Sequence, residues 1–136
     1  MKLLPAVLLA AAPVHAMTCI GEDSGANVPP VMEIRSAIED GQYARAFDFA
    51  VQRGQIDEGD ATRLGAELYD VYGTGVTSCT ILSSSGSGDT FHREAVLFES
   101  PEGLLFAAIA AYRGLEGWQV LSVHLTTNYD SILPHL

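Results

Sequence analysis

The chain has 136 residues, with 17 acidic residues against 7 basic ones and a formal net charge of −10 at pH 7. A negative field of this size repels phosphate backbones and anionic lipids, so the composition argues against a role on nucleic acids or on membrane surfaces. The length is that of one ordinary domain, which buries about two-thirds of its unfolded surface.

The first sixteen residues, 1–16, show the three zones of a secretory signal peptide. Lys2 adds positive charge, residues 3–12 form a short apolar stretch, and residues 13–16 carry small side chains where a signal peptidase reads them. The apolar stretch is about half of the roughly 20 residues that span a bilayer, so we expect cleavage near Ala16 and no membrane anchor. The mature protein is then periplasmic or secreted. Because Lys2 is the chain's one lysine, cleavage takes the net charge from −10 to −11.

Residues 17–30 lack an apolar period and are rich in Gly, Ser, Asn and Pro, which predicts a flexible linker. Cys19 in this segment and Cys79 are the two cysteines of the chain. In an oxidising compartment they can form a disulfide that ties the mature N-terminus to the predicted sheet, and the alternative is a buried Cys79 with a loose Cys19. A lipid anchor on Cys19 is disfavoured, because Thr18 stands where the bacterial lipoprotein signal requires a smaller residue.

Three helices are predicted between residues 31 and 73, where apolar side chains recur at helical spacing. The first helix begins at Val31 and ends at Asp40 and Gly41. The second begins near Tyr43 and is closed by Gly54, which suits a left-handed cap. The third is capped by Asp57 and ends at Gly73.

After residue 76 the apolar period falls to about two, which predicts strands over residues 76–83, 91–98, 104–112 and 118–127. The Ser- and Gly-rich run 83–89 predicts a turn or flexible loop. Short linkers favour an antiparallel meander of the strands. Residues 104–112, rich in alanine, would also suit a buried helix, but their length and flanking turns favour a strand. Helices followed by strands predict one α+β domain over residues 31–136, with the helices on one face of the sheet.

Two segments carry a resemblance to a known family. Residues 38–47 (Ile-Glu-Asp-Gly-Gln-Tyr-Ala-Arg-Ala-Phe) look like a helical hairpin, and residues 117–120 (Gly-Trp-Gln-Val), followed by residues 130–134, look like the closing strand, of small exported nuclear-transport-factor-2-like domains, also called cystatin-like α+β. The similarity covers about residues 31–134. It implies a reduced cone-like fold, in which a curved antiparallel sheet of about four strands encloses about three N-terminal helices and a conical apolar pocket.

The resemblance also implies a choice of functions, because the superfamily contains enzymes such as ketosteroid isomerase beside many binding and dimerisation modules. The catalytic tyrosine and carboxylate of those enzymes match no motif here, and we predict no catalytic residue. Asp48, between two phenylalanines, is expected to be solvated. The side chains that we expect to line the pocket are Phe47, Tyr72, Tyr112, Trp118 and His124.

His92, Glu94 and His124 are the residues that could form a zinc site if their strands are neighbours. Strict alternation places His92 and Glu94 on one side of a strand, and His124 on the same side of the last strand as Trp118 and Val120. Spacing across strands carries no information on register. We therefore expect no metal and no cofactor, and interpret His92 and Glu94 as polar residues on a solvated sheet face.

The sequence thus favours an exported, non-enzymatic binding or interaction module. Its partner would be a small apolar ligand in the pocket or a protein on the open sheet face, and sheet-to-sheet pairing would give a homodimer. The alternative is a small pocket-based enzyme of the isomerase or hydrolase type. A structural component of the cell envelope differs from the first hypothesis only in its partner.

Overall fold

The computed structural model describes residues 19–21 and 28–136, so the predicted signal peptide and most of the predicted linker lie outside the described residues. Helices precede strands, which confirms the predicted α+β class. The elements are α1 (Pro29–Glu39), the 3-10 helix η1 (Tyr43–Phe47), α2 (Asp48–Gln52), α3 (Glu58–Tyr72), β1 (Ser78–Ser87), β2 (Phe91–Ser100), β3 (Gly103–Gly114), β4 (Gly117–Thr126), α4 (Tyr129–Ile132) and η2 (Leu133–His135).

The ends of the helices follow the predicted signals. Asp57 caps α3, because its carboxylate accepts the backbone N–H of Asp60 at 2.8 Å. Gly54 and Gly73 adopt positive φ angles of 70° and 56° where α2 and α3 end. The predicted second helix is divided into a 3-10 turn and one short α-helix that meet at Asp48. In the part of the chain described, no helix is long and apolar enough to cross a membrane.

The four strands form one open antiparallel sheet in the order β1-β2-β3-β4, as the predicted meander requires. Residues 103–114 are a strand, which settles the ambiguity of the alanine-rich segment. The predicted loop over residues 83–89 is wrong in its first part, because residues 83–87 pair with the beginning of β2. Their side chains are mostly exposed, and backbone pairing alone extends β1 through this polar run.

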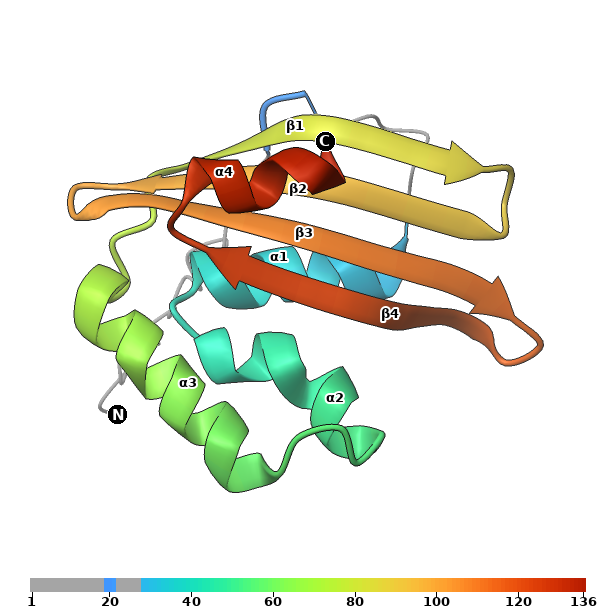
Figure 1. The fold of residues 1–136 in the computed structure, drawn as a ribbon, viewed down its shortest axis with the longest axis horizontal. Coiled ribbons are helices and arrows are strands. Elements are labelled where there is room, and N and C mark those ends of the chain that lie inside the picture. The colour runs from blue at the N-terminus through green and yellow to red at the C-terminus, as the bar shows by residue number, and fades with distance from the viewer. Residues whose placement is uncertain (1–18, 22–27) are drawn as a thin grey trace, which may run out of the picture.

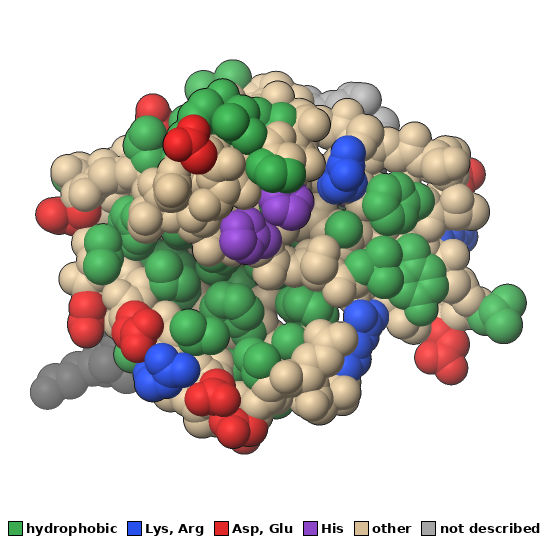
Figure 2. Space-filling model, in the orientation of Figure 1, with side chains coloured by type: hydrophobic (Ala, Val, Ile, Leu, Met, Phe, Trp, Pro, Cys, Tyr) green, Lys and Arg blue, Asp and Glu red, His purple; other side chains and the backbone are tan. Residues whose placement is uncertain are grey.

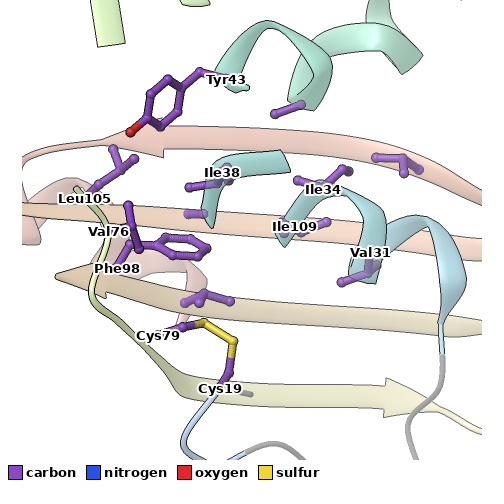
Figure 3. Packing of buried hydrophobic residues seen from close by; sticks show 14 of the residues in the cluster. Cys19, Val31, Ile34, Ile38, Tyr43, Val76, Cys79, Phe98, Leu105 and Ile109 are labelled. Carbon is purple, nitrogen blue, oxygen red and sulfur yellow. A yellow bond between two sulfur atoms is a disulfide. The ribbon is translucent and has the colours of Figure 1, made fainter. Parts of the chain in front are cut away.

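Two layers cover the sheet on opposite faces. In Figure 1, α1 lies behind the strands and the short α4 lies in front of them. The larger core fills the space between the helices and the sheet, where α1 packs Val31, Ile34 and Ile38 against β2 and β3 (Figure 3). A smaller core joins α4 to the other face through Ile132 and Phe106. No helix was predicted on that second face.

Candidate functional site

A groove of about 460 Å³ lies beside β4, where that edge of the sheet meets α1, η1 and α2. Its floor is apolar and its rim is polar. The buried floor consists of Ile34, Ala37, Ala46 and Val120, and the rim carries Glu33, Arg45, Asp48, Gln52 and Arg53. The half-buried rings of Phe49 and Trp118 complete the lining. The groove therefore lies at the margin of the core, where the helices leave apolar side chains uncovered.

Two arginines reach this groove from adjoining helical turns. Arg45 donates from its Nη1 to Oε1 of Gln42 at 2.6 Å. Arg53 follows the last turn of α2, and its guanidinium carbon lies 5.8 Å from the centroid of the Phe49 ring. Among the described residues neither arginine forms an ion pair with a carboxylate. Both guanidinium groups are thus available to an anion.

Trp118 enters the groove at the start of β4. The turn before it is tight: Gly114 pairs with Gly117, and the positive φ of 98° lies at Gly117 and not at the two residues between, as in a hairpin whose turn is followed by a glycine bulge. The Trp118 ring packs against the larger core on the helix side of the sheet. Because it is the one tryptophan of the chain, its fluorescence reports on this groove.

The structure separates the five residues that were predicted to line a pocket, and of these only Trp118 lines the groove. Phe47 is half-buried where η1 meets α2. Tyr72 is buried and donates its hydroxyl to the Leu104 carbonyl at 2.8 Å, and burial raises the pKa of this hydroxyl. Tyr112 donates to Oε1 of Gln119 at 3.0 Å.

His124 lies on the other face of the sheet, so its predicted position beside Trp118 and Val120 is wrong. The cause is a β-bulge: Ala111 pairs with Val120 and Ala110 with Ser122, which leaves Leu121 as an extra residue. One inserted residue reverses the alternation for the rest of a strand. The His124 ring instead stacks on that of His135 at 5.3 Å between centroids, and two adjoining histidines are visible on this face in Figure 2.

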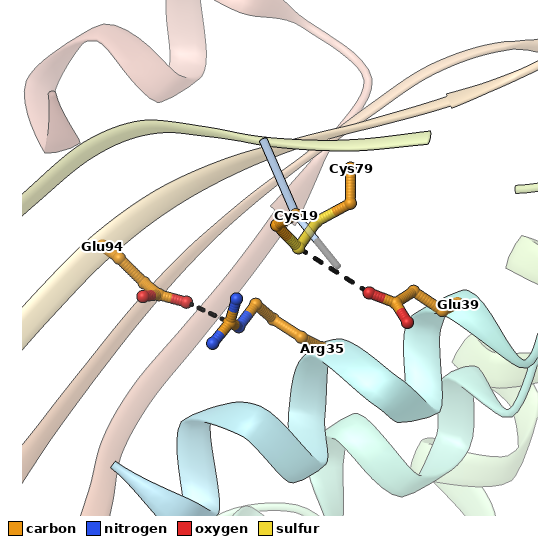
Figure 4. The surroundings of a disulfide bond; sticks show 5 residues. All are labelled: Cys19, Arg35, Glu39, Cys79 and Glu94. Carbon is orange, nitrogen blue, oxygen red and sulfur yellow. Dashed lines mark hydrogen bonds and ion pairs between the residues drawn. A yellow bond between two sulfur atoms is a disulfide. The ribbon is translucent and has the colours of Figure 1, made fainter. Parts of the chain in front are cut away.

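His92 and Glu94 are buried, so their expected place on a solvated sheet face is wrong. They lie on the face of β2 that packs against α1, together with Val96. Glu94 Oε2 lies 3.0 Å from His92 Nε2, and Glu94 Oε1 lies 3.1 Å from Arg35 Nε. The Arg35–Glu94 contact, drawn in Figure 4, is an ion pair without hydrogen-bond alignment. Since His124 is on the opposite face, the three residues do not form the zinc set considered above.

The Cys19–Cys79 disulfide is present, with the two Cα atoms 4.5 Å apart. Ile20 extends the connection by a parallel bridge to β1, in which Ile20 donates to the Cys79 carbonyl at 2.7 Å and Ile81 donates to the Ile20 carbonyl at 2.8 Å. Oε1 of Glu39 lies 3.7 Å from the Cys19 sulfur (Figure 4). This contact is not an S–H hydrogen bond, because a disulfide sulfur carries no proton.

Cys19, Glu39 and Cys79 form the one cluster of potential metal ligands found within the described residues. Metal-binding cysteines act as thiolates, and here the two sulfurs are bonded to each other. The residues of the oxidised protein therefore do not fit a metal, and the cluster is a structural staple.

Three arginines were not predicted from the sequence, and a pattern points to only one of them. Arg45 and Arg53 carry no such signal, because they belong to a nearly evenly spaced series that also contains Arg35 and Arg63. Arg35 occupies a position of the apolar stripe of α1, next to Ile34 and four residues after Val31. A charged residue in such a stripe indicates a buried partner.

Comparison of the chain with models of known families, with curated proteins and with solved structures gives no match.

Proposed function

We propose that the protein is an exported, non-enzymatic binding module whose ligand site is the groove beside β4. The observation that carries this proposal is the meeting of an apolar floor with two arginines that lack ion-pair partners among the described residues. A concave apolar site with a few convergent polar groups is the usual form of a small-ligand site.

The negative net charge of the molecule makes the lack of ion pairs at Arg45 and Arg53 informative. The chain carries 17 acidic residues, and an exposed arginine in such a chain easily finds a carboxylate. Arg63 on α3 does so twice, with Asp60 and Glu67 at 3.5 and 3.1 Å. Arg45 and Arg53 instead stand over the groove. Since a guanidinium fork binds carboxylates and sulfonates well, the ligand that suits this site combines an apolar body with an anionic group.

Membership in the nuclear-transport-factor-2-like superfamily is part of the proposal. Its support is the order of helices before an antiparallel four-stranded meander, together with the resemblance of residues 38–47 and 117–120. A protein partner on the open sheet face, including a second copy of the chain, is a further use that such a fold allows.

The alternative of a pocket-based enzyme would depend on the Arg35–Glu94–His92 cluster, because a buried carboxylate beside an imidazole can serve acid–base chemistry. Both oxygens of Glu94 already contact partners within the cluster, and none of the three residues lines the groove. This geometry favours a structural role for the cluster, so we rank the binding function above the enzymatic one.

The test is a titration with anilinonaphthalene sulfonate, which has an aromatic body and an anionic group, followed by the fluorescence of Trp118. We expect a saturable change, and an Arg53→Gln variant should weaken binding about tenfold, as expected for a lost charge-assisted hydrogen bond. Arg63→Gln is the matched control and should leave the affinity unchanged. A flat titration, or equal loss in both variants, would contradict the proposal.

A further inference from the structure

β4 is an edge of the sheet, and its backbone faces the groove. It pairs with β3 on one side, and no described residue pairs with it on the other. The groove runs along this side at Trp118, Gln119 and Val120. We infer that the groove binds an extended peptide, which adds to β4 as a fifth strand and places a carboxylate against Arg45 and Arg53. The inference rests on the proposed function and names its ligand class.

The backbone groups of β4 that point away from β3 can be identified from the pairing of the strands. Arg113 donates its N–H to the Thr90 carbonyl, away from β4, at 2.8 Å. Its partner across the ladder is Trp118, so this pair exchanges no backbone hydrogen bonds. The N–H and C=O of Trp118 therefore point to the open side, and alternation gives the same direction to those of Val120. Together these two residues offer two donors and two acceptors to an incoming strand.

The two edges of the sheet differ in how they are protected against pairing. Natural sheets protect edge strands with charges, prolines, bulges or a covering segment. β1 is covered over its first part, because Ile20 bonds to Cys79 and Ile81 along its edge. β4 contains no charged residue and no proline, and its bulge at Leu121 lies beyond the stretch that lines the groove. The segment from Gly117 to Val120 is thus left ready for pairing.

The side chains at the start of β4 extend the apolar floor of the groove. Trp118 and Val120 turn their side chains to the helix side, where Ile34 and Ala46 continue the apolar floor. Alternate side chains of an added strand would lie over this floor, which is how strand addition obtains specificity. The peptide that fits has an apolar residue at every second position.

The charges around the groove select where a peptide carboxylate can lie. Arg45 and Arg53 line the groove on the side of the helices, as do the carboxylates of Glu33 and Asp48, so an acidic end of the peptide has to lie at the arginines and away from these two acids. A second copy of this chain is a poorer occupant, because two whole chains of net charge −10 repel each other more than a peptide with one carboxylate is repelled.

The experiment uses a synthetic peptide of alternating threonine and valine with a free carboxyl end, followed by Trp118 fluorescence and by hydrogen exchange of assigned backbone amides. We expect binding that slows exchange at Trp118 and Val120 at least about tenfold. Arg53→Gln should weaken binding about tenfold, whereas Arg63→Gln should not. Amidation of the carboxyl end of the peptide should abolish the difference in affinity between the wild type and Arg53→Gln.

The outcomes separate this inference from the proposed function. Binding of the naphthalene dye without binding of the peptide overturns the inference and leaves the function standing. Strand addition is overturned if N-methylation of every valine and, in a second peptide, N-methylation of every threonine both leave the affinity unchanged, because one of these two sets supplies the main-chain donors that face β4. Slow exchange at Trp118 in the peptide-free protein, growing with protein concentration, assigns the edge to a second copy. Failure of both dye and peptide overturns the inference and the function together.

Discussion

Glu94 contacts the two other polar side chains that are buried in the core. Its carboxylate contacts the imidazole of His92 and the guanidinium of Arg35, and the side chains of Arg35 and Glu94 are 7% and 6% exposed. Removing charges from water costs several kcal/mol per ion, which a close ion pair largely offsets. The cluster therefore fixes the position of α1 over β2 more than it adds to stability.

We predict that Glu94→Gln destabilises the protein by about 3–5 kcal/mol, because it breaks a buried ion pair and removes the negative charge that faces Arg35 and His92. Chemical unfolding followed by circular dichroism measures this change. Glu116→Gln, an equal chemical change in an exposed turn, is the control and should shift stability by less than about 0.5 kcal/mol. Equal effects of the two variants would show that the ion pair is exposed to water.

Tyr43 gives a prediction for alkaline pH. Burial, followed by the neighbouring Tyr72 and Tyr69, raises the pKa of its hydroxyl above the ordinary 10.0. The folded protein therefore holds this proton more tightly than the unfolded chain. The stability from this difference is fully present below pH 10.0 and is lost as pH rises through the higher folded pKa.

Urea unfolding from about pH 8 to about pH 11 should give a free energy of unfolding that is constant up to about pH 10 and declines above it. Tyr43→Phe should make the decline less steep, and should cost about 1 kcal/mol at neutral pH through loss of the 2.8 Å bond to the Gly73 carbonyl. Tyr129→Phe removes an exposed hydroxyl and should change neutral stability by less than about 0.5 kcal/mol. An identical decline in wild type and Tyr43→Phe would argue against the buried proton.

At the scale of elements, the apolar period predicts which segments are helices and which are strands. The caps at Asp57 and Gly73 predict where α3 begins and where it ends. Strict alternation does not allow for a local insertion. In β4 the apolar residues change from even positions, Trp118 and Val120, to odd ones, Val123 and Leu125, but this change does not say which residue is extra. Nor do residues 83–87 look like a strand, because backbone pairing requires no particular side chain.

The groove was equally hard to predict, since it depends on how α2 stands relative to β4. Trp118, one of the side chains expected to line a pocket, lines the groove because it follows the hairpin turn at the start of β4. Arg45 and Arg53 carry no local mark of function. Their importance follows from the ion pairs that they do not make, which only coordinates reveal.

The packing of α3 on η1 depends on one glycine. A Cβ atom on Gly65 would lie 2.7 Å from the backbone nitrogen and the Cβ of Ala44, so the two elements would have to move apart. Gly65→Ala gains up to about 1 kcal/mol in helix propensity, but overpacking costs about 1–3 kcal/mol. We predict a net loss of about 1–2 kcal/mol, measured by thermal unfolding.

Gly59→Ala in the same helix is the matched control. Its Cβ would meet only the Asp57 carboxylate oxygen, at 3.2 Å, and that side chain can adjust. The variant should be neutral or up to about 1 kcal/mol more stable. If Gly65→Ala behaved in the same way, the close approach of α3 to η1 would be refuted.

In the molecule as a whole, the chain covers part of one edge of the sheet and leaves the other edge uncovered by described residues. Ile20 covers the edge of β1 from Cys79 to Ile81, whereas β4 faces the groove. The disulfide holds Ile20 in place through Cys19 and Cys79. Its contribution is therefore twofold: it restricts the unfolded chain and keeps this part of the β1 edge covered.

We predict that the double variant Cys19→Ala, Cys79→Ala is less stable by about 4 kcal/mol, the chain-entropy value for a sequence separation of 60. Reductant should destabilise the wild type by a similar amount and leave the double variant unchanged. The amide of Ile81, which donates to the Ile20 carbonyl at 2.8 Å, should exchange faster in the variant, while that of Val96 in the central strand β2 should follow global unfolding. Because an uncovered β1 offers a second edge for pairing, the variant should also associate more readily in light scattering. Unchanged exchange at Ile81 would mean that Ile20 covers this edge without help from the disulfide.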